Sequence, residues 1–406
     1  MNETPKITDD VPVIKPENAR HKKVAKQSKF RAIRGILFRL VAVFAVSGIA
    51  IGAYATTAIT SEIQGNSITL LSSDGKQLNE PANFDGPVNI LLVGSDARAG
   101  TQGYGHVSSV LADVIILLHI SADRKNVVAM SFPRDTMVPW PACPSTSGGP
   151  GYLPQSLGQI NATIANGGPG CTVLTVEKLT GLKIPYLAMI NFTGVIEMSN
   201  AIGGVEVCVA SPIRDPYTHT ILSKGKHTLM GKEALQFLRT RHGIGDGSDL
   251  SRISNQQVFL TSLVRKIKSQ GVLSNPAYLY SLASSVARNM TLSSNLTDVN
   301  AIVGLASTLK DVELENITFL MLPSRMGLPA PYQGRVAPVY EKANPIFKLL
   351  RDDKPIIVKD ANTYFTSVQK DKNQPTPTAS PTATTSQNKE LDGVYGTNAA
   401  TTTCSG

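Results

Sequence analysis

Three short, continuously apolar stretches constrain the fold of this chain more than any other feature. They are residues 88–94, 113–120 and 126–132. An apolar run of this length without polar alternation is typical of a β-strand that is buried on both faces of a sheet. Such strands need helices on both sides. We therefore expect an α/β fold, an α/β/α sandwich with a mixed central sheet, over roughly residues 87–360.

The remainder of this region alternates between strand and helix patterns. Apolar residues recur at helical spacing in 250–269, for example at Ile253, Leu263 and Ile267. Further strands are predicted at 185–192, 204–210 and 317–323, and further helices at 155–166, 172–180, 193–201, 231–241, 275–289 and 297–309. The sequence contains no Walker A pattern and no strand-linked GxGxxG, so nothing in it points to ATP or a dinucleotide.

A longer apolar run, residues 36–59, follows a strongly basic N-terminal segment. Only Arg39 interrupts it, and its length matches the roughly 20 residues that a helix needs to cross the hydrocarbon core. The basic segment carries much of the formal net charge of +9 and predicts a cytoplasmic N-terminus. A cleaved signal peptide fits less well, because the run and its leading segment are too long. We expect a single-pass protein of the cell membrane with residues 60–406 outside.

These patterns divide the chain into parts with different expected roles. They are a basic cytoplasmic tail (1–35), a transmembrane helix (36–59), an extracellular stalk (60–86), the large domain (87–360), a Pro/Thr/Ser-rich linker that cannot bury a core (361–390) and a short C-terminal tail (391–406). Nucleic-acid binding is the alternative role for the basic tail. Because basic residues beside a membrane span usually serve topology and attract anionic lipids, we expect a membrane partner and no nucleic acid.

Four cysteines lie on the expected outer side, where disulfides form readily. Cys143 and Cys171 each lie in a loop rich in Gly and Pro, which makes them natural partners. Cys208 lies in an apolar, strand-like run. The sequence favours neither of two alternatives for it, a buried free thiol or a disulfide with Cys404.

Charged and amide side chains gather where the predicted strands and helices begin or end. They are Asp96 and Arg98 after the first strand, Asp113 at the start of the second, Arg134 and Asp135 after the third, Arg239 and Arg241 at a helix end, and Asp249, Arg252 and Gln256 in the next helix. Ligands of open α/β sheets bind where loops leave the strand ends. We therefore expect these groups to converge on one site.

Several arginines beside carboxylates suit a phosphate-rich ligand. One guanidinium group can donate two parallel hydrogen bonds to phosphate oxygens, and it stays charged at any relevant pH. Carboxylates would repel a diphosphate, and a divalent cation held by Asp96 and Asp113 removes that repulsion. Taken singly, each residue is better explained as a turn, a helix cap or a solvated charge. The whole set on one extracellular domain favours an anion site.

The motifs that carry these residues occur in a characteristic order. NILLVGSDAR, DVIILLHISADR, SFPRDT, INATIANGG, LTGLKIPYLAMINFTGVIEMSNAIGGVEV, LMGKEALQFLRTR and DLSRISNQQ together resemble the LytR-CpsA-Psr family over roughly residues 87–325. The resemblance implies a phosphotransferase of cell-wall biogenesis with an extracellular catalytic domain. It would take a polyprenyl-diphosphate-linked glycan donor, attach the glycan to a peptidoglycan acceptor through a phosphodiester and release polyprenyl phosphate.

The resemblance also assigns roles. Asp96 and Asp113 match the family's metal-binding aspartates, which implies Mg²⁺ or Mn²⁺, and Arg134 matches the arginine of its PRD motif. Arg239, Arg241 and Arg252 match its diphosphate-binding arginines, and Gln256 matches the first Gln of its RQQ motif. We expect Asp113 to act with these arginines in catalysis, and Arg98, Asp135, Asp249 and Gln256 to bind substrate. The polyprenyl chain would lie in an apolar tunnel between sheet and helices.

The sequence departs from the family pattern at two places. Leu111 and Ala112 stand where the family has Arg-Ser before the aspartate, and Asn255 replaces the arginine of the RQQ motif. Fewer positive charges should weaken the grip on a diphosphate. The alternatives are therefore a catalytically weak scaffold that binds the lipid or glycan and a lipid pyrophosphatase. A transmembrane attenuator of transcription has only the basic tail in its favour.

Overall fold

A computed structural model of the chain describes most residues from Gln64 onward. The described ranges are 64–78, 82–96, 110–145, 149–269, 288–298, 309–356 and 394–406, with Thr57, Ser61, Leu282, Ser285, Val286, Val358 and the backbone of 366–368. All of them belong to one unit, residues 56–406. The membrane span expected at 36–59 lies outside the described residues apart from Thr57. Within the described part, no helix is long and apolar enough to cross a membrane.

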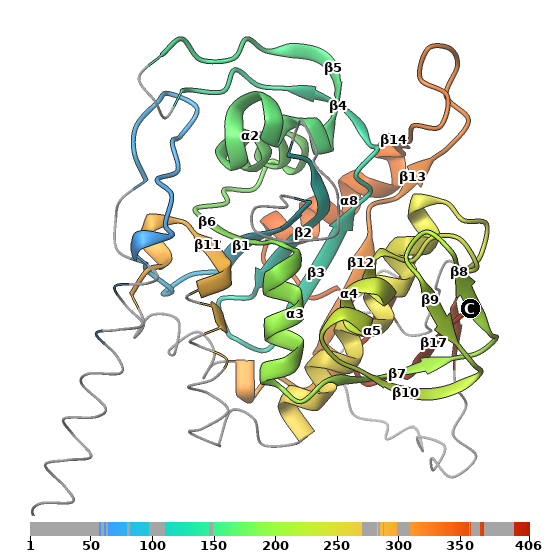
Figure 1. Cartoon of the computed structure of the whole chain (residues 1–406). Coiled ribbons are helices and arrows are strands. Elements are labelled where there is room, and N and C mark those ends of the chain that lie inside the picture. Colours follow the sequence, from blue (N-terminus) through green and yellow to red (C-terminus); the bar gives the residue numbers. More distant parts are fainter. Residues whose placement is uncertain are drawn as a thin grey trace, which may run out of the picture. The chain divides into compact units, whose positions relative to one another are not determined.

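A seven-stranded mixed sheet forms the centre of the structure (Figure 1). In the order β11-β6-β1-β2-β3-β12-β16, the pairs β1–β6 and β3–β12 are parallel and the others antiparallel. The strands are β1 (Val88–Ser95), β2 (Ala112–Ile120), β3 (Val127–Phe132), β6 (Tyr186–Ile190), β11 (Met290–Leu292), β12 (Ile317–Met321) and β16 (Gly396–Asn398). The three apolar stretches form β1 to β3, which confirms the predicted α/β fold with a mixed central sheet.

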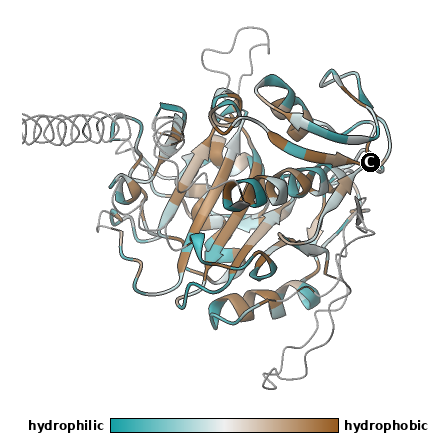
Figure 2. Cartoon of the chain, turned by 90° about the horizontal axis from the view of Figure 1, so that it is seen from below, coloured by the Kyte–Doolittle hydropathy of each residue, from teal (hydrophilic) through white to brown (hydrophobic). Residues whose placement is uncertain are grey.

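Helices cover both faces of the sheet, because its strands are apolar on both sides (Figure 2). They are α2 (Thr163–Thr180), α3 (Phe192–Ala201), α4 (Lys232–Arg239), α5 (Asp249–Ser269) and α8 (Tyr340–Arg351). On one face Leu91 and Met130 belong to a core shared with α2 and α8. On the other face Ile90 and Ile116 pack in a core that α5 joins. Alternate residues of one strand thus build two cores.

The segment 155–166 differs from the helix predicted there. β5 (Gln155–Gln159) pairs antiparallel with β4 (Met137–Trp140), and the 3-10 turn η1 (Ile160–Ala162) leads into α2. Gly158 permits this pairing, because a Cβ at that position would lie 2.5 Å from the Trp140 ring. The two strands form an arm that extends beyond the sheet (Figure 1).

The C-terminal residues join the fold, although the sequence analysis set 391–406 apart as a tail. β16 lies at an edge of the central sheet. A second sheet has the order β10-β7-β17-β15 and contains β7 (Val205–Val209), β10 (Gly225–Leu229), β15 (Thr366–Val368) and β17 (Thr403–Ser405). β15 falls within the predicted linker 361–390, whose other residues lie outside the described part. Such short strands depend on their neighbours for burial, so composition alone does not reveal them.

Both pairs of cysteines are at disulfide distance. Cys143 and Cys171 pair as predicted, with an S–S distance of 1.97 Å, and Cys208 pairs with Cys404 at 1.96 Å. The second pair ties the C-terminal strand β17 to its parallel neighbour β7. On the chain-entropy model, sequence separations of 28 and 196 residues correspond to about 3.6 and about 5 kcal/mol of stabilisation.

Candidate active site

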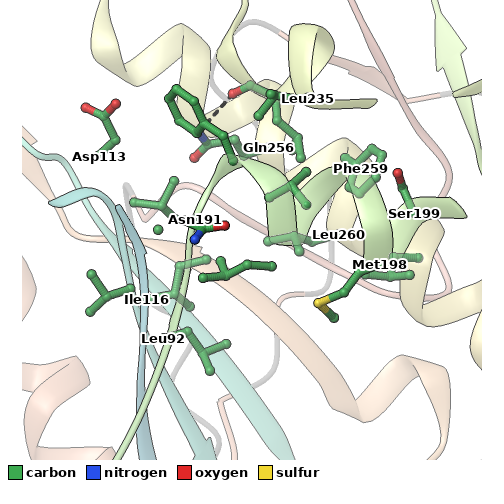
Figure 3. Close-up of a pocket in the computed structure, with 18 of the residues that line it drawn as sticks. Leu92, Asp113, Ile116, Asn191, Met198, Ser199, Leu235, Gln256, Phe259 and Leu260 are labelled. Carbon is green, nitrogen blue, oxygen red and sulfur yellow. Dashed lines mark hydrogen bonds between the residues drawn. The ribbon is translucent and has the colours of Figure 1, made fainter. Parts of the chain in front are cut away.

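A cavity of about 330 Å³ lies between the sheet and the helices α3, α4 and α5. Leu92 and Ile116 of the sheet, Met198 of α3, Leu235 of α4 and Leu260 of α5 contribute to its apolar wall (Figure 3). Its volume falls in the range of about 300–1,000 Å³ that is typical of small-molecule sites. The cavity lies where the sequence analysis expected an apolar tunnel, and we call this part its body.

The cavity also has polar lining residues, which we call its mouth: Asp113, Arg239, Arg252 and Gln256. Asp113 is the second residue of β2, Arg239 ends α4, and Arg252 and Gln256 lie one turn apart on α5. Residues four apart on a helix share a face, so Arg252 and Gln256 lie on the same side of α5 as Leu260. The structure therefore brings together residues that are far apart in sequence, as predicted.

Arg134 extends the mouth, because its guanidinium donates a short hydrogen bond to Oδ1 of Asp113. Its Nε lies 3.6 Å from Oδ2 of Asp135 and 3.7 Å from Oδ1 of Asp249. Burial disfavours the charge of Arg134, but Asp113, Asp249 and Asp135 outweigh it and raise the pKa of this arginine. Arg134 is therefore a fixed positive charge surrounded by three carboxylates.

Arg252 is the second arginine that contacts Asp113. It is only 4% exposed, and its Nη2 lies 2.6 Å from Oδ1 of Asp249 and donates to the backbone oxygen of Asp113 at 2.8 Å. Burial lowers its pKa and the nearby charges of Arg134 and Arg241 act in the same direction, whereas Asp249 and Asp113 act against them. An arginine keeps its proton even so. Arg252 thus places a charge where little solvent screens it.

Asp135 and Asp249 connect Arg134 to the residues around it. Asp135 Oδ1 accepts hydrogen bonds from Gln159 Nε2 at 2.6 Å and Arg335 Nη1 at 2.7 Å. Asp249 Oδ2 accepts one from the backbone N–H of Arg134 at 3.1 Å. The sequence analysis predicted that both carboxylates bind substrate. In the structure, both contact Arg134 and position it. The sequence reasoning missed Gln159 and Arg335, and neither belongs to a motif that could have revealed them.

Arg239 and Arg241 approach the mouth from the end of α4. The helix ends between them, since Thr240 has ψ 132°, which allows side chains two residues apart to serve one site. The Arg239 guanidinium lies 4.6 Å from the centre of the Phe192 ring, a cation–π contact. The Nε of Arg241 is buried and makes no hydrogen bond within the described residues.

The two carboxylates predicted to bind a divalent cation lie at the adjoining ends of β1 and β2. Asp96 Oδ1 accepts the N–H of Leu111 at 2.7 Å, and Asp96 N–H donates to Leu111 O at 3.2 Å, which holds Asp96 beside the start of β2 and hence Asp113. The described residues contain no group of three or more His, Cys, Asp or Glu side chains suited to a metal. Two carboxylates with phosphate oxygens are the ligands that Mg²⁺ commonly takes.

The two departures from the family pattern occupy different surroundings. Leu111 lies next to the Asp96 carboxylate, whereas Asn255 points away from the cavity. Asn255 is 1% exposed, its Nδ2 donates to Phe237 O at 2.6 Å, and its Oδ1 accepts the hydroxyl of Ser405. Gln256, the next residue along the helix, donates a hydrogen bond of 3.1 Å from its Nε2 to Leu238 O. Arg98 lies outside the described residues.

The site thus combines an apolar cavity with a mouth lined by arginines and an aspartate, within a mixed α/β sheet covered by helices. The chain belongs to the LytR_cpsA_psr family, whose model matches residues 52–342. It is 29% identical to "Cell wall biosynthesis protein LcpA" of Corynebacterium glutamicum, with 74% of this chain and 61% of that protein covered. The chain thus spans less than two thirds of that relative's length.

Two further similarities agree with this membership. "Polyisoprenyl-teichoic acid–peptidoglycan teichoic acid transferase TagT" of Bacillus subtilis is 28% identical, with 74% of this chain and 88% of that protein covered. The solved structure "LytR-Csp2A-Psr enzyme from Actinomyces oris" has a TM-score of 0.51 at 24% identity and covers 70% of this chain and 94% of its own. The structural likeness shows that the fold is shared.

Proposed function

We propose that this protein transfers a glycopolymer from a polyprenyl-diphosphate donor to peptidoglycan during cell-wall biogenesis. The observation that carries the proposal is one cavity with an apolar body and an arginine-lined mouth. The body suits the polyprenyl chain, since burying apolar surface contributes roughly 25 cal/mol per Å². The mouth suits the diphosphate. The name of the related TagT describes a transfer of this kind.

In the proposed reaction, a hydroxyl oxygen of the acceptor attacks the phosphorus that carries the glycan. A new P–O bond forms, the bond from that phosphorus to the bridging oxygen breaks, and polyprenyl phosphate leaves with the electron pair. The acceptor proton is lost to solvent. Arg239, Arg241 and Arg252 hold the two phosphates, and Arg134 stabilises the charge that develops on the transferred group. Positioning and charge stabilisation account for most catalysis of phosphoryl transfer.

We propose Mg²⁺ or Mn²⁺ as the cofactor, held by Asp96 and Asp113. When bound, it would neutralise charge between these carboxylates and the diphosphate. This proposal is supported by the contacts of Asp113 with Arg134 and Arg252, which use Oδ1 and the backbone oxygen. We further propose that residues 36–59 anchor the protein in the cell membrane and that the catalytic domain lies outside, where its substrates are.

The test is release of polyprenyl phosphate by the full chain from a polyprenyl-diphosphate glycan in the presence of Mg²⁺ and peptidoglycan. We expect Arg134→Ala to reduce the rate by about 10²–10³-fold, as when one preorganised donor to developing charge is removed. Arg351→Ala is the matched control, because Arg351 ends α8 and its Nη1 bonds Thr180 O on the other face of the sheet. Binding of the lipid without turnover by the wild type would instead favour the scaffold alternative.

A further inference from the structure

A buried carboxylate clamps a surface hairpin to the loop that carries Arg241. The hairpin consists of β8 (Ile213–Asp215) and β9 (Thr220–Leu222). Asp215 is 1% exposed. Its Oδ1 accepts the N–H of Tyr217 at 2.9 Å, and its Oδ2 accepts the N–H groups of Arg241 at 3.0 Å and His242 at 3.1 Å.

The clamp joins the two loops through an ionised carboxylate. Burial acts to raise the pKa of Asp215, but hydrogen bonds from backbone N–H groups, first that of Arg241, outweigh it and lower the pKa. The carboxylate therefore stays ionised, and charge-assisted hydrogen bonds are the stronger kind. Thr220 and Thr240 add a buried hydroxyl contact of 2.7 Å between hairpin and loop. The surface that the two loops present is therefore preorganised.

Two aromatic rings lie on this rigid surface. The Tyr217 and His242 ring centres are 4.5 Å apart with 44° between their planes. His242 is exposed, and Tyr217 is 76% exposed although the clamp holds its backbone in place. The pair therefore leaves most of the Tyr217 ring open to a ligand.

The loop that carries His242 leads from a residue of the mouth, Arg239. His242 directly follows Arg241, whose charge acts on the buried Arg252, and Arg239 two residues earlier lines the cavity. In the proposed function, a diphosphate held by these arginines would bring the donor sugar or the acceptor close to the Arg241 loop.

We propose that Tyr217 and His242 form a stacking platform for a pyranose ring, an inference that rests on the proposed transferase function. A pyranose has a face of C–H bonds and a rim of hydroxyl groups. The C–H face suits the negative face of an aromatic ring, while the Tyr hydroxyl and the His nitrogens offer hydrogen bonds to the rim. The sugar comes either from the donor, next to the diphosphate, or from the acceptor glycan.

The first experiment measures binding of a soluble β-1,4-linked N-acetylglucosamine tetramer to the full chain by saturation-transfer NMR and titration. We expect Tyr217→Ala to weaken binding by roughly threefold to tenfold, the effect of one aromatic contact, and Tyr217→Phe to restore most of it. Tyr152→Ala is the control, since Tyr152 is 50% exposed on the segment that leads into β5.

The second experiment distinguishes the two sources. If the platform holds the acceptor, Tyr217→Ala raises the KM for peptidoglycan in the transfer assay; if it holds the donor sugar, the KM for the donor rises. The proposal is overturned if Tyr217→Ala changes neither the binding of the tetramer nor either KM, or if Tyr152→Ala changes them equally. Binding that depends on Tyr217 in a chain that performs no transfer would refute the proposed function and leave the platform standing.

Discussion

The body and the mouth of the cavity are built on opposite principles. Apart from a few polar residues such as Asn191 and Ser199, the body consists of apolar side chains that face one space, for instance Leu92, Met198 and Leu260. The mouth contains paired charges, Arg134 with Asp113 and Arg252 with Asp249, beside Arg239 and Gln256. In the proposed function the body binds the polyprenyl chain, and it should tolerate substitution of one apolar residue by another. In the proposed function the mouth is the site of the chemistry, where Arg134 and Arg252 have defined carboxylate partners.

The largest effect is expected where the mouth is broken from within. Arg252→Ala removes the charge that compensates Asp249 and Asp113, so we expect about 3–5 kcal/mol of lost stability from uncompensated buried charge. Transfer activity should fall below detection. Urea unfolding followed by circular dichroism measures the stability. Arg252→Lys keeps the positive charge and should lose less stability than Arg252→Ala. Equal loss of stability in the two variants would contradict this explanation.

A smaller effect is expected when polarity is placed in the body. Leu260→Gln puts an amide into the apolar wall, which should raise the KM for the polyprenyl donor about tenfold, or about 1.4 kcal/mol, with kcat little changed. Leu260→Met keeps volume and apolarity and should behave as wild type. A loss of kcat at unchanged KM would show that body and mouth do not divide the work in this way.

A third prediction concerns the position where the chain departs from its family. Asn255→Arg restores the family residue, yet it would bury a charge among Phe237 O and Ser405 instead of placing it in the mouth. We expect no gain in transfer and a loss of stability of roughly 1–3 kcal/mol. Ser405→Ala removes only the hydroxyl that donates to Asn255 and should destabilise the protein less. A rise in activity would mean that residue 255 can face the diphosphate.

The smallest effect is a dependence of stability on pH that arises far from the mouth. His119 is buried, and this burial lowers its pKa below the ordinary 6.5 although Asp353 lies 3.1 Å away. The unfolded chain then binds the proton more readily, so the stability is present above pH 6.5 and is lost as the pH falls below it. Melting temperatures from pH 7.5 to 5.5 should fall less in His119→Gln than in wild type. His219→Asn, which alters an exposed histidine, should leave the slope unchanged.

The sequence predicted the features that a local pattern determines. Two-sided burial identified β1, β2 and β3, and ordered motifs located Asp113, Arg134 and Arg252. Features that depend on distant partners escaped it. The C-terminal strands gain their stability from β12 and β7. Arg335 contacts Asp135 from 200 positions away. α8 went unpredicted because it contains Pro345, a residue that usually ends helices.

Asn255 shows the same limit at the site itself. A motif match assigned its position to the diphosphate, but the side chain lies on another face of α5 from Arg252 and Gln256 and bonds to Ser405. The consequence of the substitution could be found only from the packing of the C-terminal strand. Sequence thus predicted which residue types form the mouth, and packing determined which of them reach it.

The most direct test of the account is the product balance of one reaction. The full chain is incubated with a polyprenyl-diphosphate glycan, Mg²⁺ and peptidoglycan, and polyprenyl phosphate, peptidoglycan-linked glycan phosphate and free glycan phosphate are quantified together. The account predicts one polyprenyl phosphate released for each glycan joined to peptidoglycan through a phosphodiester. Release of polyprenyl phosphate with only free glycan phosphate, even when the acceptor is saturating, would contradict it and identify the protein as a lipid pyrophosphatase.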